Sequence, residues 1–176
     1  MGNMSMRKHA SIGCCGIDCG LCPRFYTTGS SRCPGCGGDG FEQKHPSCSF
    51  ITCCAKKRGL EVCAQCGEFP CGKFDKETGE RDSFVTHRRV MSNQRLIADI
   101  GLNRFLERQT ERMMFLETAL TRYDDGKSKS YFCLAAALLS ISSLNEALSL
   151  AEKGESLRDT LKRFAEAEGQ ELVLRK

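Results

Sequence analysis

Twelve of the thirteen cysteines of this chain lie between Cys14 and Cys71, and this clustering limits how that part can fold. Two cysteines separated by two residues can direct both sulfur atoms at one ion from a tight turn, and four sulfurs complete a tetrahedron around Zn²⁺. The spacing therefore predicts bound metal, with zinc as the first expectation. In order, the pattern is Cys14-Cys15-x3-Cys19-x2-Cys22, Cys33-x2-Cys36, Cys48-x4-Cys53-Cys54 and Cys63-x2-Cys66-x4-Cys71.

The segment that carries these cysteines, residues 13–76, is rich in glycine and poor in apolar side chains. A segment this short with so few apolar residues is not expected to fold by burial alone. Metal binding would supply the missing folding free energy, so we expect this segment to be unfolded without its ions. We predict three parts: a flexible tail over residues 1–12, a cysteine-rich zinc-binding module over 13–76 and a helical bundle over 77–176.

The second half of the chain has a different pattern. Cysteine occurs there once, at Cys133, and apolar residues recur at the three- and four-residue spacing of helices. The predicted fold class is mainly α, with a small irregular metal-stapled module before a bundle of four to five helices. The helices are expected from Asp82 or Ser83 to Gly101, from Asn103 to Tyr123, over Tyr131–Ser140 after a Ser130 cap, and after the caps Ser143 and Ser156, with Gly154 and Gly169 ending the last two.

The formal net charge of +4 does not by itself indicate a nucleic-acid partner. Each zinc ion bound by four thiolates has a net charge of about −2, so two such sites would bring the total to about zero. The N-terminus has no apolar region of the kind that a signal peptide carries, and the longest apolar run, Tyr131 to Ile141, is about half the ~20 residues that a membrane span needs. We therefore expect a cytoplasmic protein without a membrane partner, in which clustered cysteines indicate metal rather than disulfides.

Glycine follows the second cysteine in two of the pairs, as Gly37 after Cys36 and Gly67 after Cys66. A zinc knuckle uses a left-handed residue there so that backbone amides turn toward the sulfurs, and glycine adopts that conformation without steric cost. Two or three zinc ions are expected, with closed sites. The predicted ligands are Cys15, Cys19, Cys22, Cys33, Cys36, Cys48, Cys54, Cys63, Cys66 and Cys71.

The cysteine spacing and the residues between the cysteines resemble the cysteine-rich family DUF3795 of bacteria and archaea. The resemblance covers residues 14–74 and implies metal binding without an established activity. Relative to the family pattern, Cys14 and one of Cys53 and Cys54 look additional, so we expect a Cys14→Ser change to be mild. The matching motifs are Cys15-Gly-Ile-Asp-Cys19-Gly-Leu-Cys22-Pro, Cys33-Pro-Gly-Cys36 and Cys54-Ala-Lys-Lys-Arg-Gly-Leu-Glu-Val-Cys63-Ala-Gln-Cys66-Gly-Glu-Phe-Pro-Cys71.

Several alternatives remain open at this point. An iron–sulfur cluster would use the same thiolates, and His45 could replace one of them. The basic run Lys56–Arg58 could contact nucleic acid, although a solvated surface is the simpler interpretation. We expect a binding protein of unknown partner rather than an enzyme, with structural metals and an interaction surface on the helical half.

Two further basic features lie in the helical half. The loop from Asp124 to Ser130 carries two lysines before a helix and could hold a small anion. Arg104, Arg108 and Arg112 repeat every four residues, and Glu107 and Glu111 stand beside them. For this arginine series we expect exposed ion pairs along one helix.

Overall fold

The computed structural model describes residues 7–45, 47–75 and 81–176, and this part of the chain is helical without strands. The predicted class is therefore confirmed: short turns in a cysteine-rich half, then a bundle of five helices. The first half contains the 3-10 turns η1 (Cys19–Leu21), η2 (Gly29–Ser31) and η4 (Cys63–Gln65), the helices α1 (Phe41–Lys44) and α2 (Ser49–Ile51), and the π-helix η3 (Thr52–Lys57). The bundle contains α3 (Val90–Ile100), α4 (Leu102–Arg122), α5 (Lys129–Leu138), α6 (Ile141–Glu152) and α7 (Leu157–Ala167).

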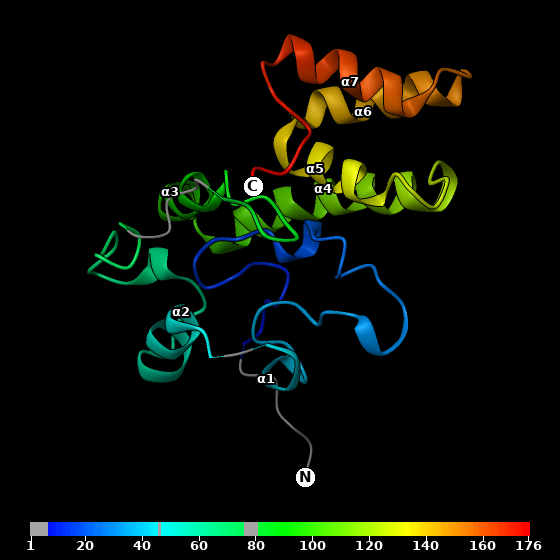
Figure 1. Ribbon diagram of the computed structural model, residues 1–176. Coiled ribbons are helices and arrows are strands. Elements are labelled where there is room, and N and C mark those ends of the chain that lie inside the picture. The colour runs from blue at the N-terminus through cyan, green and yellow to red at the C-terminus, as the bar shows by residue number, and fades with distance from the viewer. Residues whose placement is uncertain (1–6, 46, 76–80) are drawn as a thin grey trace.

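Helix α4 is the axis around which the other elements are arranged. It contacts α3, α5 and α6, and also η1 of the cysteine-rich half. Figure 1 shows α6 and α7 stacked on one side of α4 and the cysteine-rich half on the opposite side. The apolar segment expected around residues 131–140 forms α5, whose residues 132–137 are all buried. Among the described residues, no helix is both long and apolar enough to cross a membrane.

The ends of the last two helices depend on serine caps and glycines. Ser156 accepts a hydrogen bond from the amide of Asp159 and begins α7, as predicted. Helix α6 begins earlier than predicted, because Ser140 rather than Ser143 is its cap and accepts from the Ser143 amide. Gly154 follows α6 with a φ of 101°, a left-handed conformation that favours glycine, as predicted.

The helix predicted to start at Asp82 or Ser83 starts only at Val90. The carboxylate of Asp82 accepts hydrogen bonds from the amides of His87 and Arg175, at 2.8 Å each. Because its carboxylate binds the C-terminal segment, Asp82 does not cap a helix. The chain from Asp82 to Arg89 is a loop. The cap predicted at Ser130 is also shifted, since α5 begins at Lys129 with Ser128 in the cap position.

The two halves are joined by buried amide side chains. Asn93 donates to the carbonyl of Gly16, Gln94 donates to the carbonyl of Cys14, and Gln109 donates to the carbonyl of Ser11. Because each of these three side-chain amides has an acceptor, they can be buried at the junction without the free-energy cost of an unpaired donor. The predicted boundary between residues 76 and 77 lies outside the described residues, and independence of the two parts stays a prediction.

Part of the predicted tail is ordered against this junction. Ile12 is fully buried and packs with Val62, Ile97 and Phe105. Arg7 is also buried. The expectation of a flexible tail is therefore replaced by a packed segment for residues 7–12, while residues 1–6 lie outside the described residues.

The cap of α7 gives a direct test of the helix boundaries. We expect Ser156→Ala to lower the free energy of unfolding by about 1 kcal/mol, because the Asp159 amide loses its acceptor. Ser149 is exposed in the middle of α6 and makes a matched control. Ser149→Ala should leave stability unchanged or raise it slightly, since alanine has the higher helix propensity. Equal effects of the two changes in denaturant unfolding would contradict the assignment of Ser156 as cap.

Candidate metal centre

The guanidinium of Arg7 ties together the three segments that carry the cysteines. Its Nη1 donates to the carbonyls of Ile12 and Cys36 at 2.7 Å each, and its Nη2 donates to the carbonyl of Glu61 at 2.6 Å. The five donors of a guanidinium point in fixed directions, so one arginine can satisfy several carbonyls at once. Arg7 thereby places the segments around residues 12, 36 and 61 next to one another.

Five cysteines from these segments form a thiol cluster, which we define as the buried Cys14, Cys36 and Cys54 and the half-buried Cys19 and Cys63. The Cys36 side chain is hydrogen-bonded to those of Cys14 and Cys19. The Cys14 side chain is also bonded to that of Cys54, which in turn is bonded to that of Cys63. These side-chain interactions therefore connect cysteines that are far apart in the sequence.

Within the thiol cluster, the interactions between the thiols lower the pKa of Cys36 and raise the pKa of Cys14. Donation from Cys14 and then from Cys19 holds the pKa of Cys36 at about 3, and nearby Arg7 acts in the same direction. The bonds to Cys36 and Cys54, with burial, raise the pKa of Cys14 far above its usual value. The cluster thus favours a thiolate at Cys36 surrounded by neutral thiols.

Burial and neighbouring cysteines also shift the pKa values of Cys54 and Cys15. The bond from Cys14 lowers the pKa of Cys54, but the bond to Cys63 and burial outweigh it and raise this pKa to about 12. Burial raises the pKa of Cys15 to about 12 as well, and the charges of Cys36 and Cys48 add to the effect. Cys15 and Cys48 therefore lie beside the cluster.

The π-helix η3 separates the adjacent residues Cys53 and Cys54. Cys54 is buried in the thiol cluster, whereas Cys53 interacts with Arg58, whose guanidinium also donates to the Cys66 sulfur at 3.1 Å. A π-turn has a wider hydrogen-bonding interval than an α-turn, and such turns recur at functional sites. A cavity of about 30 Å³ opens beside η3, and five cysteines share its wall: Cys53, Cys54, Cys63, Cys66 and Cys71.

A third group contains the remaining two predicted ligands. The Nε2 atom of His45 lies 3.4 Å from the sulfur of Cys33, and the His45 ring stacks on Phe41 with centroids 4.4 Å apart. Burial raises the pKa of Cys22, and the nearby Cys33 adds to that rise. Cys33 and Cys36 therefore belong to different groups, although their spacing predicted that both would direct their sulfurs at one ion.

The two glycines predicted to form knuckle turns differ. Gly37 has a φ of 75°, the left-handed conformation expected after Cys36, whereas Gly67 is not in that region, so the prediction for Gly67 is wrong. Gly35, between the cysteines of the first pair, has a φ of 85° and lies against the Ala10 carbonyl. A Cβ at Gly35 would stand 2.1 Å from that oxygen, so only glycine fits there.

All thirteen cysteines are described, and none forms a disulfide. Within residues 7–45, 47–75 and 81–176, no group of three or more His, Cys, Asp or Glu side chains is placed so that it could hold one metal ion. The cysteines therefore lie in neighbouring groups, and none of these groups has the arrangement of a formed metal site among the described residues.

Arg7 and two cysteines of this centre, Cys14 and Cys53, were not among the predicted ligands. Cys14 has no exposed surface and two thiol partners, although its place beside Cys15 suggested that it only packs. Arg7 lies in the expected tail, and a lone arginine gives no pattern that could have identified it. For Cys14, the signal in the sequence was its adjacency to Cys15, but two adjacent cysteines rarely bind the same tetrahedral ion, so the pattern did not require both.

The basic run Lys56–Arg58 is largely neutralised by acids. Lys56 pairs with Glu42 at 2.5 Å and Arg58 pairs with Glu68 at 2.7 Å, both on the surface. Two of the three charges thus have local partners. The run forms a solvated surface next to the cysteine cavity, which favours the simpler of the two interpretations of these residues.

Comparison with known proteins bears on the cysteine-rich half. Residues 11–76 match the family described as "Protein of unknown function (DUF3795)", which confirms the resemblance seen in the cysteine spacing. The similarity is limited to this segment, and the helices α3 to α7 lie outside the match. A search of curated proteins and a search of solved structures each found no match.

Replacement of Arg7 tests how the centre is held together. We expect Arg7→Lys to lower the free energy of unfolding by about 3 kcal/mol, because an ammonium group cannot reach all three carbonyls that the guanidinium satisfies. The same change at Arg104, which is exposed on α4, should cost less than about 0.5 kcal/mol. A similar loss for both variants in urea unfolding would show that Arg7 does not organise the cysteine segments.

Proposed function

We propose that this protein binds zinc through its cysteine-rich half and that the metals are structural. The observation that supports the proposal most strongly is the cavity of about 30 Å³ whose wall includes five cysteines. Thiolate is the preferred ligand of structural zinc, and four such ligands close a site. Thiols that are neither in disulfides nor dispersed over the surface need another role, and metal binding provides one.

The cavity suggests a first site made of Cys54, Cys63, Cys66 and Cys71. Cys54 is favoured over Cys53 because it also belongs to the thiol cluster and matches the family motif. A second site would draw its ligands from Cys14, Cys15, Cys19, Cys36 and Cys48, which lie together on the inner side. Binding would replace thiol–thiol hydrogen bonds by metal–sulfur bonds, through rotation of side chains that already neighbour one another.

The sparse apolar content of this half supports a structural role for the metals. Its buried cluster includes three cysteines, namely Cys14, Cys36 and Cys54, together with Phe50, Ile51, Phe74 and Val90. Replacing neutral, partly satisfied thiols by bonds to a dication would add folding free energy where few apolar side chains contribute it. The same ligands would accept an iron–sulfur cluster, so metal identity has to be measured directly.

Cobalt binding tests the two proposed sites. Co²⁺ occupies tetrahedral thiolate sites and absorbs visible light there, so titration of the reduced metal-free protein should saturate at about two ions per chain. Cys66→Ser should remove about one of these ions, because it takes a ligand from the cavity. Cys133→Ser is the matched control, since Cys133 is buried among apolar residues of α5 and should keep both. An unchanged stoichiometry in the Cys66 variant would refute the cavity site.

Metal removal tests the structural role. We expect a chelator with mild acid to abolish the dispersed amide signals of residues 13–75 while most helical circular dichroism persists. The reason is that the main apolar cluster lies mostly in or beside α4 to α7 and the C-terminal segment, whereas the cysteine-rich half contributes Leu21 and the half-buried Tyr26. Simultaneous loss of both signals would show that the protein is one cooperative unit and contradict the predicted independence of the helices.

A further inference from the structure

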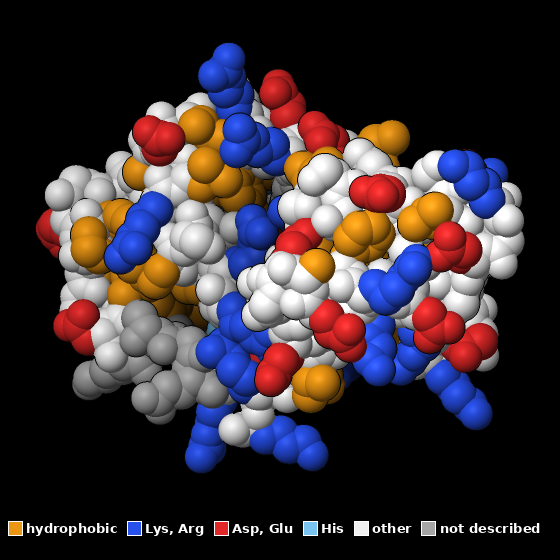
Figure 2. All heavy atoms as spheres, turned by 90° about the horizontal axis from the view of Figure 1, so that it is seen from above, with side chains coloured by type: hydrophobic (Ala, Val, Ile, Leu, Met, Phe, Trp, Pro, Cys, Tyr) orange, Lys and Arg blue, Asp and Glu red, His pale blue; other side chains and the backbone are white. Residues whose placement is uncertain are grey.

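A second cavity, with Asp18 in its wall, lies between α3, α4 and the start of α6. Its volume is about 380 Å³, within the ~300–1,000 Å³ typical of small-molecule sites. Figure 2 shows Lys and Arg side chains gathered along the hollow that separates the α3 side of the molecule from the α6–α7 side. The cavity is therefore both large enough for a small molecule and positively charged.

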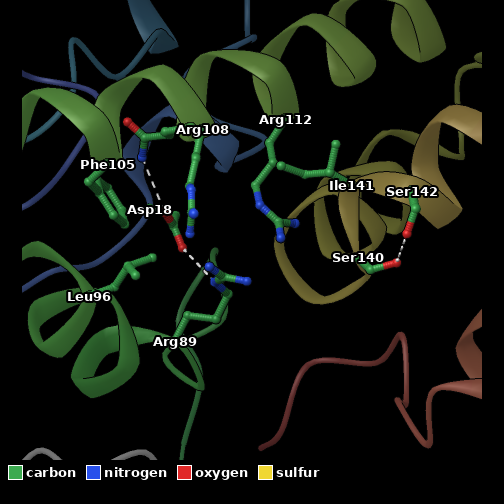
Figure 3. Close-up of a pocket in the computed structure, with 10 residues that line it drawn as sticks. Asp18, Arg89, Leu96, Phe105, Arg108, Arg112, Ser140, Ile141 and Ser142 are labelled. Atoms are coloured by element: carbon green, nitrogen blue, oxygen red, sulfur yellow. Dashed lines mark hydrogen bonds and ion pairs between the residues drawn. The ribbon is translucent and has the colours of Figure 1, made fainter. Parts of the chain in front are cut away.

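Three arginines enter this cavity from two directions. Arg108 and Arg112 descend from successive turns of α4, and Arg89 reaches toward them from the loop before α3 (Figure 3). The ion pairs expected along α4 are absent from the described residues, since neither Arg108 nor Arg112 pairs with Glu107 or Glu111. The four-residue spacing directs these guanidinium groups at a common space instead.

The three guanidinium groups differ in how firmly they are held. Arg112 donates to the carbonyls of Ala136 and Leu139 at the end of α5, and burial, followed by the charge of Arg89, lowers its pKa to about 10. Arg89 binds the side-chain oxygen of Asn93 and lies 3.7 Å from Asp18. Arg108 has no hydrogen bond or ion pair within the described part of the chain. Its guanidinium is thus available to a ligand.

The carboxylates near the cavity leave it with excess positive charge. Asp18 is the acid in its wall, and donors from Asn93 and Gln109 already occupy both of its oxygens. Glu168 lies behind Ser140, where it accepts hydrogen bonds from the Ser140 amide and from the hydroxyls of Ser140 and Ser143. Like charges that converge in a partly buried space repel one another, and a bound anion would relieve that repulsion.

The rest of the wall complements the arginines. Ser140 is the cap of the twelve-residue helix α6, and Ile141 and Ser142 are its first two residues. The amides of Ser140 and Ser143 already donate to Glu168 and to Ser140 Oγ, so the amides of Ile141 and Ser142 are the ones left for an anion. Leu96, Phe105 and Ile141 add an apolar surface. We propose that this cavity binds a small phosphomonoester, with its phosphate between Arg89, Arg108 and Arg112 and its organic part against Leu96 and Phe105.

The loop from Asp124 to Ser130, where the sequence suggested an anion, is arranged differently. The carboxylate of Asp124 accepts hydrogen bonds from the amides of Gly126 and Ser128, and Asp125 accepts from the amide of Lys127. An added anion would have to displace both carboxylates. The two locations can therefore be compared in one experiment.

The test is titration of the full-length protein with inorganic phosphate and with phenyl phosphate at low ionic strength, followed by amide NMR. We expect saturable shifts at Ile141 and Ser142, no comparable shifts at residues 126–128, and tighter binding of phenyl phosphate by roughly tenfold. Arg108→Gln should weaken both ligands by roughly tenfold or more, because a charge-assisted hydrogen bond to phosphate is lost. Arg104→Gln is the control, since this exposed arginine of α4 lies outside the cavity wall and should bind as the unaltered protein does.

Four results would overturn the proposal. No saturable shift in the unaltered protein would exclude the site, and shifts confined to residues 126–128 would place the anion at the other loop. Equal affinity of the Arg108→Gln and Arg104→Gln variants would exclude the arginine pocket. Binding of succinate, a dicarboxylate of similar charge, as tightly as phosphate would show a general anion site rather than a phosphate site.

Discussion

The buried carboxylate of Asp18 bonds the cysteine-rich half to two helices of the bundle at once. It is buried, it accepts hydrogen bonds from Asn93 of α3 and Gln109 of α4, and it lies 3.7 Å from the guanidinium of Arg89. A buried carboxylate without such partners would be costly, so the loop that carries it can take this path only when both helices are in place. Asp18 therefore helps to position the cysteine-rich half on the bundle, together with the amide contacts of Asn93, Gln94 and Gln109.

Asp18 also connects the two sites described above. Its neighbour Cys19 belongs to the thiol cluster, while Asp18 itself forms part of the wall of the arginine-lined cavity. The proposed metal centre and the proposed phosphate site are thus adjacent along the chain. A structural change at either site would therefore affect the loop that carries Asp18 and Cys19. Each site nevertheless has its own residues and is tested with its own ligand.

Much of the fold could be predicted from local sequence, because helix periodicity and the caps at Ser156 and Gly154 act over a few residues. The shifted starts of α3 and α6 have a long-range cause: Asp82 binds Arg175, and Ser140 is held by Glu168.

For the cysteines, the spacing predicted which residues would serve as ligands and in which region, but not which cysteines would lie together. Arg7 binds carbonyls near Cys14 and Cys63 and that of Cys36, which brings these cysteines together across long stretches of sequence, whereas Cys33 lies beside His45. The pocket arginines looked like a solvated helix face for the same reason, since their convergence depends on Arg89 and on the start of α6.

Metal content is the property on which the proposed role of the cysteine-rich half depends. The most direct measurement is elemental analysis, with acid-labile sulfide, of protein purified without oxygen. We expect about two zinc atoms per chain, no sulfide and no visible colour. Stoichiometric iron with acid-labile sulfide, or protein that is fully folded with reduced thiols and no bound metal, would contradict a structural role for zinc.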